Sequence, residues 1–422
     1  MATALVGFVQ CTEAQFSCVT NDGAITITGC SVNAGAVIIP STTNGYPVVN
    51  IGDDAFANHG ITSVTIPDSV TNIGEATFYD CTSLASVSLG NGLVTLGTLG
   101  FEDCSALTGI TFPSSLTSIG SYEFNHCSSL ASLTIPNTVT NIGDNAFAYC
   151  NDLTNVTIGS GITTFPSYAF YECTSLPGID IPTNITSIGD YVLSDCTLLT
   201  AIKVDPANPD FSSLNGVLFN KNQTSILQYP AGKTTNGYTI PSAVTNIGTA
   251  AFLFCTNLTH VTIPNGVTSI GTNAFWGDLN LSGLVIPASV GSIRDSAFEY
   301  CTNLTAMYFQ GPPPNLGYGP FANDTNLVIY YLPGATGWSS PFSGVTAELW
   351  NPKASKFSVT GGHFGFKIIG PTNAVIVVAA CTNLANPAWL RVSTNTLTSG
   401  ASSFTDAQSP NYTGRFYRLR SP

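Results

Sequence analysis

The cysteines are the residues of this chain with the widest possible chemistry, because thiols can form disulfides, bind metals or act as nucleophiles. Most of the 12 cysteines follow a spacing of 23 residues that is interrupted and then resumes. The series consists of Cys81, Cys104, Cys127, Cys150, Cys173, Cys196, Cys255 and Cys301. No C-x-x-C pair is present and a straight row cannot form a tetrahedral cluster, so a zinc site is disfavoured. The fixed interval indicates a repeat array instead.

Stacked coils place equivalent residues one strand spacing apart, about 4.8 Å. The Cα atoms would then be within disulfide range, but side chains that point the same way keep their Cβ atoms beyond the usual ~3.8 Å. We therefore expect a buried ladder of free thiols that donate weakly to backbone carbonyls. Where His59, Asp278 and Asp324 replace cysteine, we expect the polar side chain to make the same backbone contact.

Four cysteines lie outside this register. They are Cys11, Cys18, Cys30 and Cys381. The first three can supply one disulfide in an N-terminal cap, and the sequence leaves the pairing open.

Histidines and carboxylates complete the chemically active residues. His59, His126, His260 and His363 are scattered, and none pairs with a Ser or Cys in a known nucleophile motif. Asp80, Asp103, Glu172 and Asp195 adjoin the ladder cysteines and would stack in one solvated stripe, for which weak calcium binding is the alternative. The loop at residues 205–210 is a second weak calcium candidate. The sequence therefore predicts no catalytic residue, no metal site, no cofactor and no enzyme activity.

The residues around each cysteine repeat with it. A Phe lies three residues before this position from Phe56 to Phe321, with Leu193 as the one exception, and a Leu lies three residues after it. Two apolar residues one apart follow, as in Leu133 and Ile135, which predicts a short strand with one buried face. An Ile-Gly pair seven to eight residues before the cysteine predicts a tight corner.

Each coil is thus expected to contain a strand, a Pro-marked turn, a second extended stretch and a short helical turn from Phe to Cys. The unit L-x-x-V/I-x-I-P-x-x-V-T-x-I-G-x-x-A-F-x-x-C resembles the BspA-like class of leucine-rich repeats, over roughly residues 14–350. The resemblance implies an α/β solenoid, a curved right-handed leucine-rich-repeat array of short parallel strands. It also implies a secreted or surface-exposed bacterial protein that binds other molecules, without catalytic residues.

Charge divides the chain into two parts. Residues 1–350 carry four Lys/Arg against 23 Asp/Glu, whereas residues 351–422 carry seven against one. The expected organisation is an N-terminal cap and first strands (1–48), a solenoid (49–333) with an irregular long coil (205–243), a solenoid cap (334–350) and a small module (351–422). An acidic solenoid repels phosphate backbones, so nucleic acid is excluded as its partner.

The last 72 residues lack the 23-residue period and read as short strands separated by Gly, Pro and Asn turns. The expected strands are 356–359, 364–369, 374–380, 389–392, 402–405 and 415–420. They predict a small all-β, sandwich-like domain. Its ending resembles the C-terminal modules of exported bacterial multidomain proteins, which implies surface retention or carbohydrate association; a spacer or stabilising cap is the alternative.

The start of the chain is apolar but has no basic stretch and is too short for a full signal peptide. We expect that a signal has been removed from a secreted or cell-surface protein, with a cytosolic protein as the alternative. No apolar run approaches the ~18 residues of a membrane helix, so no membrane span is predicted.

The residue between the two buried positions of each strand must face outward, and stacking carries it along the concave sheet as a row. The candidate ligand-binding residues on this row and its neighbour are Thr111, Thr134, Thr157, Asp180, Lys203, His260, Thr262 and Tyr308. A second candidate surface consists of aromatic residues on the Phe-to-Cys turn, with core packing as the alternative. Its members are Tyr79, Tyr149, Tyr171, Phe254, Trp276 and Tyr300.

The irregular long coil contains two apolar stretches, 216–219 and 225–229, around a polar turn. They predict a hairpin that projects from the array. Three functions remain open: recognition or adhesion with a protein or glycan partner, structural self-assembly, and hydrolysis. The lack of a catalytic constellation disfavours the third, and a C-terminal cap on the solenoid favours a monomer over self-assembly.

Overall fold

The computed structural model describes residues 15–371, 374–397 and 400–420. Its internal contacts divide the chain into two units, Met1–Thr234 with Gly248–Cys255 and Thr235–Ile247 with Thr256–Pro422. In the described part of the chain the one helical segment is a single 3-10 turn, Ser409–Asn411. The solenoid and the all-β C-terminal module that the sequence predicts are both present.

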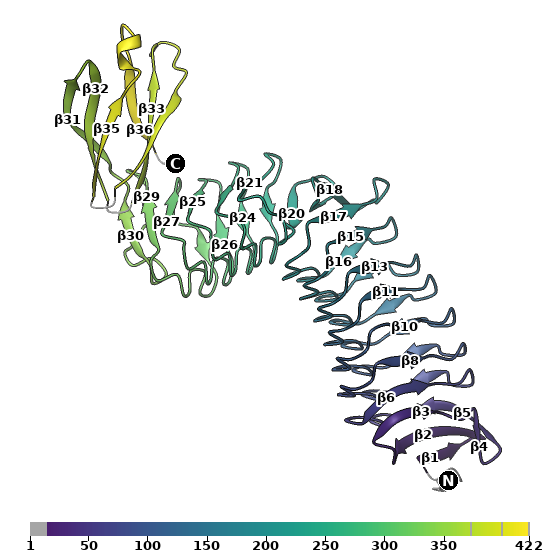
Figure 1. Cartoon of the computed structure of the whole chain (residues 1–422). Coiled ribbons are helices and arrows are strands. Elements are labelled where there is room, and N and C mark those ends of the chain that lie inside the picture. Colours follow the sequence, from purple (N-terminus) through teal and green to yellow (C-terminus); the bar gives the residue numbers. More distant parts are fainter. Residues whose placement is uncertain (1–14, 372–373, 398–399, 421–422) are drawn as a thin grey trace. The chain divides into compact units, whose positions relative to one another are not determined.

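The coils of unit 1 lie one above another, and most of them contribute a longer and a shorter strand (Figure 1). We call the first set the long strands: β3 (Ala34–Ile38), β6 (Gly60–Thr65), β8 (Ser86–Ser88), β11 (Ser132–Thr134), β13 (Asn155–Thr157), β15 (Gly178–Ile181) and β17 (Ala201–Val204). The short strands lie at the Ile-Gly corner: β7 (Asn72–Ile73), β9 (Thr95–Leu96), β10 (Ser118–Ile119), β12 (Asn141–Ile142), β14 (Thr164–Phe165) and β16 (Ser187–Ile188). Strands of both sets pair in parallel with a register of 23 residues, as between Leu133 and Val156 or Ile119 and Ile142.

The N-terminal cap of unit 1 begins with an antiparallel pair. The strands of the cap are β1 (Phe16–Asn21), β2 (Ala24–Cys30), β4 (Thr42–Thr43) and β5 (Tyr46–Ile51). β1 pairs with β2, which pairs in parallel with β5, and β5 continues into the short-strand row through β7. The first parallel rung is therefore built on a hairpin that covers the end of the array.

The core of each coil is filled by the Phe position. Phe78 and Phe101 stack with ring centroids 5.0 Å apart, and Phe124 and Phe147 at 5.6 Å. All four rings are fully buried. Each ring is therefore enclosed by the equivalent rings of its neighbours.

The segment from Phe to Cys forms two turns rather than the expected helical turn. Tyr122 and His126 have positive φ angles of 57° and 58°, in the left-handed region that non-glycine residues usually avoid. The N–H groups of Tyr122 and His126 donate to the next coil, to Asp144 O (2.9 Å) and Ala148 O (3.0 Å). These donors are used between coils and cannot close a helix within one coil.

The irregular long coil contains β18 (Phe211–Leu214), β19 (Val217–Asn220) and β20 (Ser225–Gln228). β19 and β20 form the predicted hairpin. The expectation that it projects from the array is wrong, because Leu218, Phe219 and Ile226 are almost completely buried. An apolar hairpin is more stable when its side chains are removed from water, so it packs into the core as a modified coil.

Unit 2 contains coil strands that pair in parallel and the C-terminal module. Its coil strands are β21 (Gly237–Thr239), β22 (Asn246–Ile247), β23 (His260–Thr262), β24 (Ser269–Ile270), β25 (Gly283–Ile286), β26 (Ser292–Ile293), β27 (Ala306–Phe309), β28 (Asn315–Leu316), β29 (Val328–Tyr331) and β30 (Thr346–Leu349). The module strands are β31 (Lys353–Thr360), β32 (His363–Ile369), β33 (Val375–Cys381), β34 (Leu390–Thr396), β35 (Ala401–Asp406) and β36 (Phe416–Arg420). They form two antiparallel sheets, β31-β32-β35 and β34-β33-β36.

Truncation of a stacked ring tests this core. We expect Phe124→Ala to lower the free energy of unfolding by about 3–5 kcal/mol, because the cavity lies between coils that contact only their neighbours. Urea denaturation followed by circular dichroism measures the change. Thr134→Ala on the exposed face is the control and should stay within about 0.5 kcal/mol. Equal midpoints for the two variants would show that the Phe row does not carry the core.

Candidate functional site

The long-strand face presents most of the predicted binding row. Thr111, Thr134, Thr157, Asp180, Lys203, His260 and Thr262 are all exposed. The first five belong to unit 1 and the last two to unit 2. The predicted outward orientation therefore holds for these positions, although Thr111 lies outside any strand, and their role in binding stays a prediction.

A shallow depression lies over β13, β15 and β17 in unit 1. Its lining includes Asn155, Pro177, Asp180, Thr200 and Lys203. Asp180 and Lys203 are direct partners in the parallel pairing of β15 with β17. Neither takes part in an ion pair among the residues described. Two opposite, solvated charges thus stand side by side on an otherwise hydroxylated face.

Tyr308 is not part of this exposed row, which corrects the prediction from the sequence. It is only 4% exposed and lies in one apolar cluster with Phe366, Ile376 and other residues of the module. Its ring stacks on Tyr330 at 5.2 Å, and its hydroxyl accepts from Val375 N at 2.5 Å. The outward row of the last coils therefore holds the module, and the 23-residue pattern gives no signal for this cover.

The aromatic residues of the turn face are partly exposed, as the sequence suggested. In unit 1, Tyr149 and Tyr171 form a continuous series of contacts with three further rings, those of His126, Tyr168 and Tyr191. The ring pairs are His126–Tyr149 at 4.2 Å, Tyr149–Tyr171 at 5.4 Å, Tyr168–Tyr171 at 5.6 Å and Tyr168–Tyr191 at 4.8 Å. In unit 2, Trp276 and Tyr300 meet at 5.4 Å. Because rings in the parallel pairs cover one another's faces, edges and the ends of each stack are the parts available to a ligand.

The cysteines of the 23-residue series are buried and free. Each thiol in the regular coils approaches the carbonyl of the preceding Phe position, as in Cys104 Sγ to Phe78 O (3.2 Å) and Cys150 Sγ to Phe124 O (3.3 Å). Burial raises the pKa of the Cys104 and Cys127 thiols well above the ordinary value. Thiolates are the reactive form, so these residues are poor nucleophiles and poor metal ligands.

The cysteines outside the series differ from one another. Cys18 is disulfide-bonded, while Cys30 and Cys381 are free. Cys11 lies outside the described residues. The N-terminal cap therefore contains a disulfide, as the sequence suggested.

The residues that replace cysteine in the 23-residue series differ in their contacts. His59 places Nε2 3.0 Å from Cys30 O, which is the backbone contact that the sequence predicts. Asp324 is buried, and this burial raises the pKa of its carboxyl to about 8. A polar side chain at this position thus either reaches a carbonyl or is driven toward its neutral form.

Glu123 is a buried acid that the sequence reading missed. It is completely buried and its Oε2 accepts from Gly100 N at 2.8 Å. A Cβ atom at Gly100 would lie 2.5 Å from Glu123 Oε1, so the glycine provides the space for the carboxyl. Burial raises the pKa of Glu123 well above its usual range. The signal in the sequence was a Glu at a position where most coils have Ala, directly after a coil that has Gly.

Two further carboxyls have a raised pKa: that of Asp195 in the acidic stripe and that of Glu102, which is adjacent to stripe residue Asp103. Burial and the charge of Asp103 raise the pKa of Glu102 to about 7, and burial and Glu172 raise that of Asp195 to about 6. The described residues contain no group of three or more His, Cys, Asp or Glu side chains arranged to hold a metal ion. In the loop at 205–210, Asp205 Oδ1 caps its own turn by accepting from Ala207 N at 2.8 Å.

Comparison with known proteins gives the family. The model of the BspA type leucine rich repeat region, which spans six copies, matches residues 49–176, 118–236 and 231–336. The chain belongs to this family. No curated protein matches the sequence.

Solved structures of bacterial leucine-rich repeat proteins resemble the chain. A leucine rich cell surface protein from Faecalibacterium prausnitzii is 30% identical, with a TM-score of 0.66 over 79% of this chain and 97% of that one. A leucine-rich repeat protein from Eubacterium ventriosum is 26% identical, with a TM-score of 0.51 over 80% and 82%. The pneumococcal vaccine antigen PcpA is 18% identical, with a TM-score of 0.58 over 83% and 95%, and shares the fold. Among the described residues of this chain, no helix has the length and hydrophobicity needed to cross a membrane.

Thiol accessibility tests the burial of the cysteine series. We expect a maleimide reagent to label few of these cysteines in the native protein and all of them after denaturation, because the native thiols are enclosed and protonated. Mass spectrometry of digested samples identifies the labelled positions. Rapid native labelling of Cys104, Cys127 or Cys150 would contradict the arrangement.

Because the buried carboxyls have a raised pKa, we expect the stability of the protein to fall as the pH rises. A carboxyl whose pKa is higher in the folded than in the unfolded chain keeps its proton on folding, so its contribution is complete below about pH 4.5 and is lost as the pH rises toward the folded pKa. Glu123→Gln keeps the shape without the charge. We expect the free energy of unfolding of the variant to rise relative to that of the native protein, by at most about 1.4 kcal/mol per pH unit above pH 5.

Urea denaturation at pH 5, 6, 7 and 8 measures this difference. Thr134→Ala, which removes no titratable group, is the control and should leave the pH profile unchanged. Parallel profiles for the native protein and the Glu123 variant would show that Glu123 has an ordinary pKa.

Proposed function

We propose that the protein is exported and recognises a protein or glycan partner through the long-strand face of unit 1. The observation that carries this proposal is the depression over β13, β15 and β17, where Asp180 and Lys203 are exposed and adjacent in register. The likeness to a cell surface protein of Faecalibacterium prausnitzii supports a place on the bacterial surface or outside the cell.

The composition of the row explains why this part of it is favoured. The same small side chain recurs at Thr111, Thr134 and Thr157. Threonine is favourable on any exposed strand, and identical residues do not fix the position of a partner along the row. Adjacent negative and positive charges do fix it, because a partner with complementary charges can bind in only one orientation. Both groups are solvated, so a partner must offer hydrogen bonds or opposite charges that replace water.

Exchange of the two charges tests the proposal. We expect Asp180→Lys combined with Lys203→Asp to reduce partner affinity at least tenfold, because two charge pairs become like-charge contacts while the net charge stays constant. A glycan array and a panel of extracellular proteins, probed with the full chain, identify partners, and biolayer interferometry then compares the variants. Stability should change by less than about 0.5 kcal/mol, since both positions are exposed.

The control variant changes charged residues on the turn face instead of the long-strand face. Asp80→Asn combined with Asp103→Asn alters two acids of the turn face and should leave affinity within about twofold. If the turn-face variant loses binding while the strand-face variant retains it, recognition belongs to the aromatic and acidic turn face, where rings from His126 to Tyr191 form their continuous series.

A further inference from the structure

Regular coils of unit 1 are joined at the Ile-Gly corner by bonds of both polarities. Ile119 O accepts from Gly143 N at 3.0 Å, and Tyr122 N donates to Asp144 O at 2.9 Å. In addition, the side chain of Asp144 accepts from Ser167 N at 3.0 Å. Between regular coils, the acceptors are therefore the carbonyl before the glycine position and, where Asp follows the glycine position, a side-chain carboxylate; the donor is an N–H group of the turn.

This set of bonds is interrupted after the coil that ends at Cys196. The equivalent groups are the carbonyl of Ile188, the N–H groups of Tyr191 and Leu193, and the carboxylate of Asp190. Within the described part of the chain, none of these groups has a hydrogen-bond partner. The reason is that the hairpin strand β20 occupies the place of the next regular coil and does not pair with β16.

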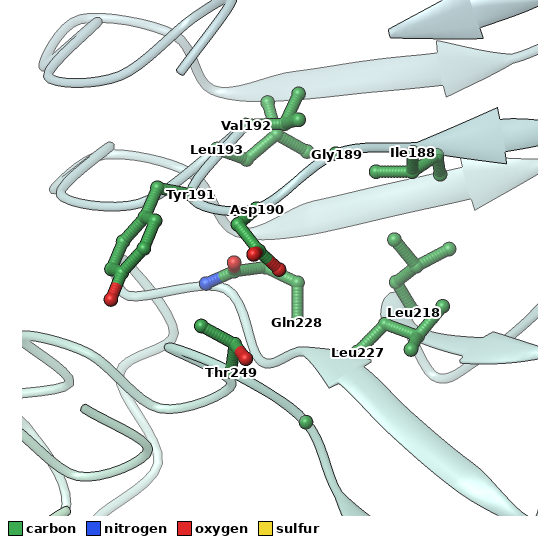
Figure 2. A pocket seen from close by; sticks show the side chains of 11 residues that line it. Ile188, Gly189, Asp190, Tyr191, Val192, Leu193, Leu218, Leu227, Gln228 and Thr249 are labelled. Carbon is green, nitrogen blue, oxygen red and sulfur yellow. The ribbon is translucent and has the colours of Figure 1, made fainter. Parts of the chain in front are cut away.

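A cavity of about 80 Å³ lies at this interruption, and we call it the corner pocket. Its lining divides into two parts (Figure 2): Asp190, Tyr191, Gln228 and Thr249 gather on one side, and the aliphatic chains of Ile188, Leu218 and Leu227 on the other. The volume exceeds that of one water molecule several times, and the aliphatic side offers water no polar partner. A ligand that fills the pocket must therefore bring both polar atoms and a small apolar group.

The unpaired donors and acceptors of the corner pocket limit the type of ligand that can bind there. An anion would accept from Tyr191 and Leu193 but would be repelled by the carboxylate of Asp190. A cation would pair with Asp190 but would leave both N–H groups unsatisfied, which is costly away from water. An extended backbone carries N–H and C=O groups together. Between regular coils such a backbone makes contacts of this kind: Gly143 N donates to Ile119 O, and the carbonyls of Asp144 and Ala146 accept from the N–H groups of Tyr122 and Phe124.

We propose that the corner pocket binds a short extended peptide segment of a partner protein. Its N–H groups donate to Ile188 O and to the Asp190 carboxylate, and its carbonyls accept from Tyr191 and Leu193. One aliphatic side chain enters between Leu218 and Leu227. The mode is strand addition at an open edge, in which the backbone bonds give affinity and the apolar pocket selects the side chain.

A synthetic probe follows from the repeat itself. The capped peptide Thr-Asn-Ile-Gly-Asp-Asn-Ala reproduces residues 140–146, whose Gly143 N, Asp144 O and Ala146 O bond to the preceding coil in the native array. With a fluorescent label on the peptide, anisotropy should show saturable binding to the full chain. A second peptide with N-methylglycine in place of glycine lacks the N–H that would pair with Ile188 O, and should bind at least about tenfold more weakly.

Two variants place the peptide in the pocket. Leu227→Trp fills the apolar side and should abolish binding, while Asp190→Asn should weaken it about tenfold by removing the charged acceptor. The matched control is Asp144→Asn at the same repeat position, whose carboxylate is already bonded within the array. It should leave peptide affinity unchanged. If the Trp variant does not fold, the comparison of the two Asp→Asn variants still decides.

The proposal is overturned by any of three results. They are no saturable binding at about 1 mM peptide, equal binding of the N-methylated peptide, and equal effects of the Asp190 and Asp144 variants. Displacement of the labelled peptide by methyl glycosides would also overturn it, in favour of a sugar site.

Discussion

The structure depends on one constraint, which is that every coil must offer the next coil the same pattern of backbone donors and acceptors. The N–H groups of the turn and the carbonyl of the Ile position point along the array, so a coil is satisfied only by a neighbour in register. The 23-residue period of Phe, Cys and Ile-Gly is the consequence of this requirement in the sequence. It also explains why left-handed residues such as Tyr122 and His126 are tolerated, because the strain of each is offset by a bond to the next coil.

The sequence predicted those features that repeat. The spacing of Phe124 and Phe147 gave the buried stack, and the alternation in β11 gave the outward position of Thr134. It did not predict the turn conformation, because the residues at positive φ are not glycines and the bonds that hold them lie between coils. It also failed for Tyr308, whose burial depends on a module that lies outside the repeat. A periodic pattern contains the contacts of a coil with its neighbours and nothing about a surface that something else covers.

The pair of Gly100 and Glu123 shows how the array tolerates a local departure from its rule. A carboxyl at a position usually held by Ala needs additional space, and the missing side chain of Gly100 in the preceding coil provides it. The cost is desolvation, which the bond from Gly100 N offsets only in part, so the acid stays protonated at a higher pH than usual. Because each coil contacts only its neighbours, the exchange affects two coils and leaves the register of the rest unchanged.

Recognition in a repeat protein has to depend on such departures, because identical coils present the same surface many times and cannot distinguish one register of a partner from the next. Two departures in unit 1 offer different kinds of specificity. Asp180 and Lys203 change the charge of an otherwise uniform face without any change of backbone, so they select a partner by its surface charges. The corner pocket changes the backbone itself and leaves unpaired the groups that elsewhere hold coil to coil, so it selects a partner by main-chain geometry. Ionic strength affects the first more than the second, because the first depends on two exposed charges, whereas the pocket depends mainly on backbone hydrogen bonds and on one carboxylate, that of Asp190.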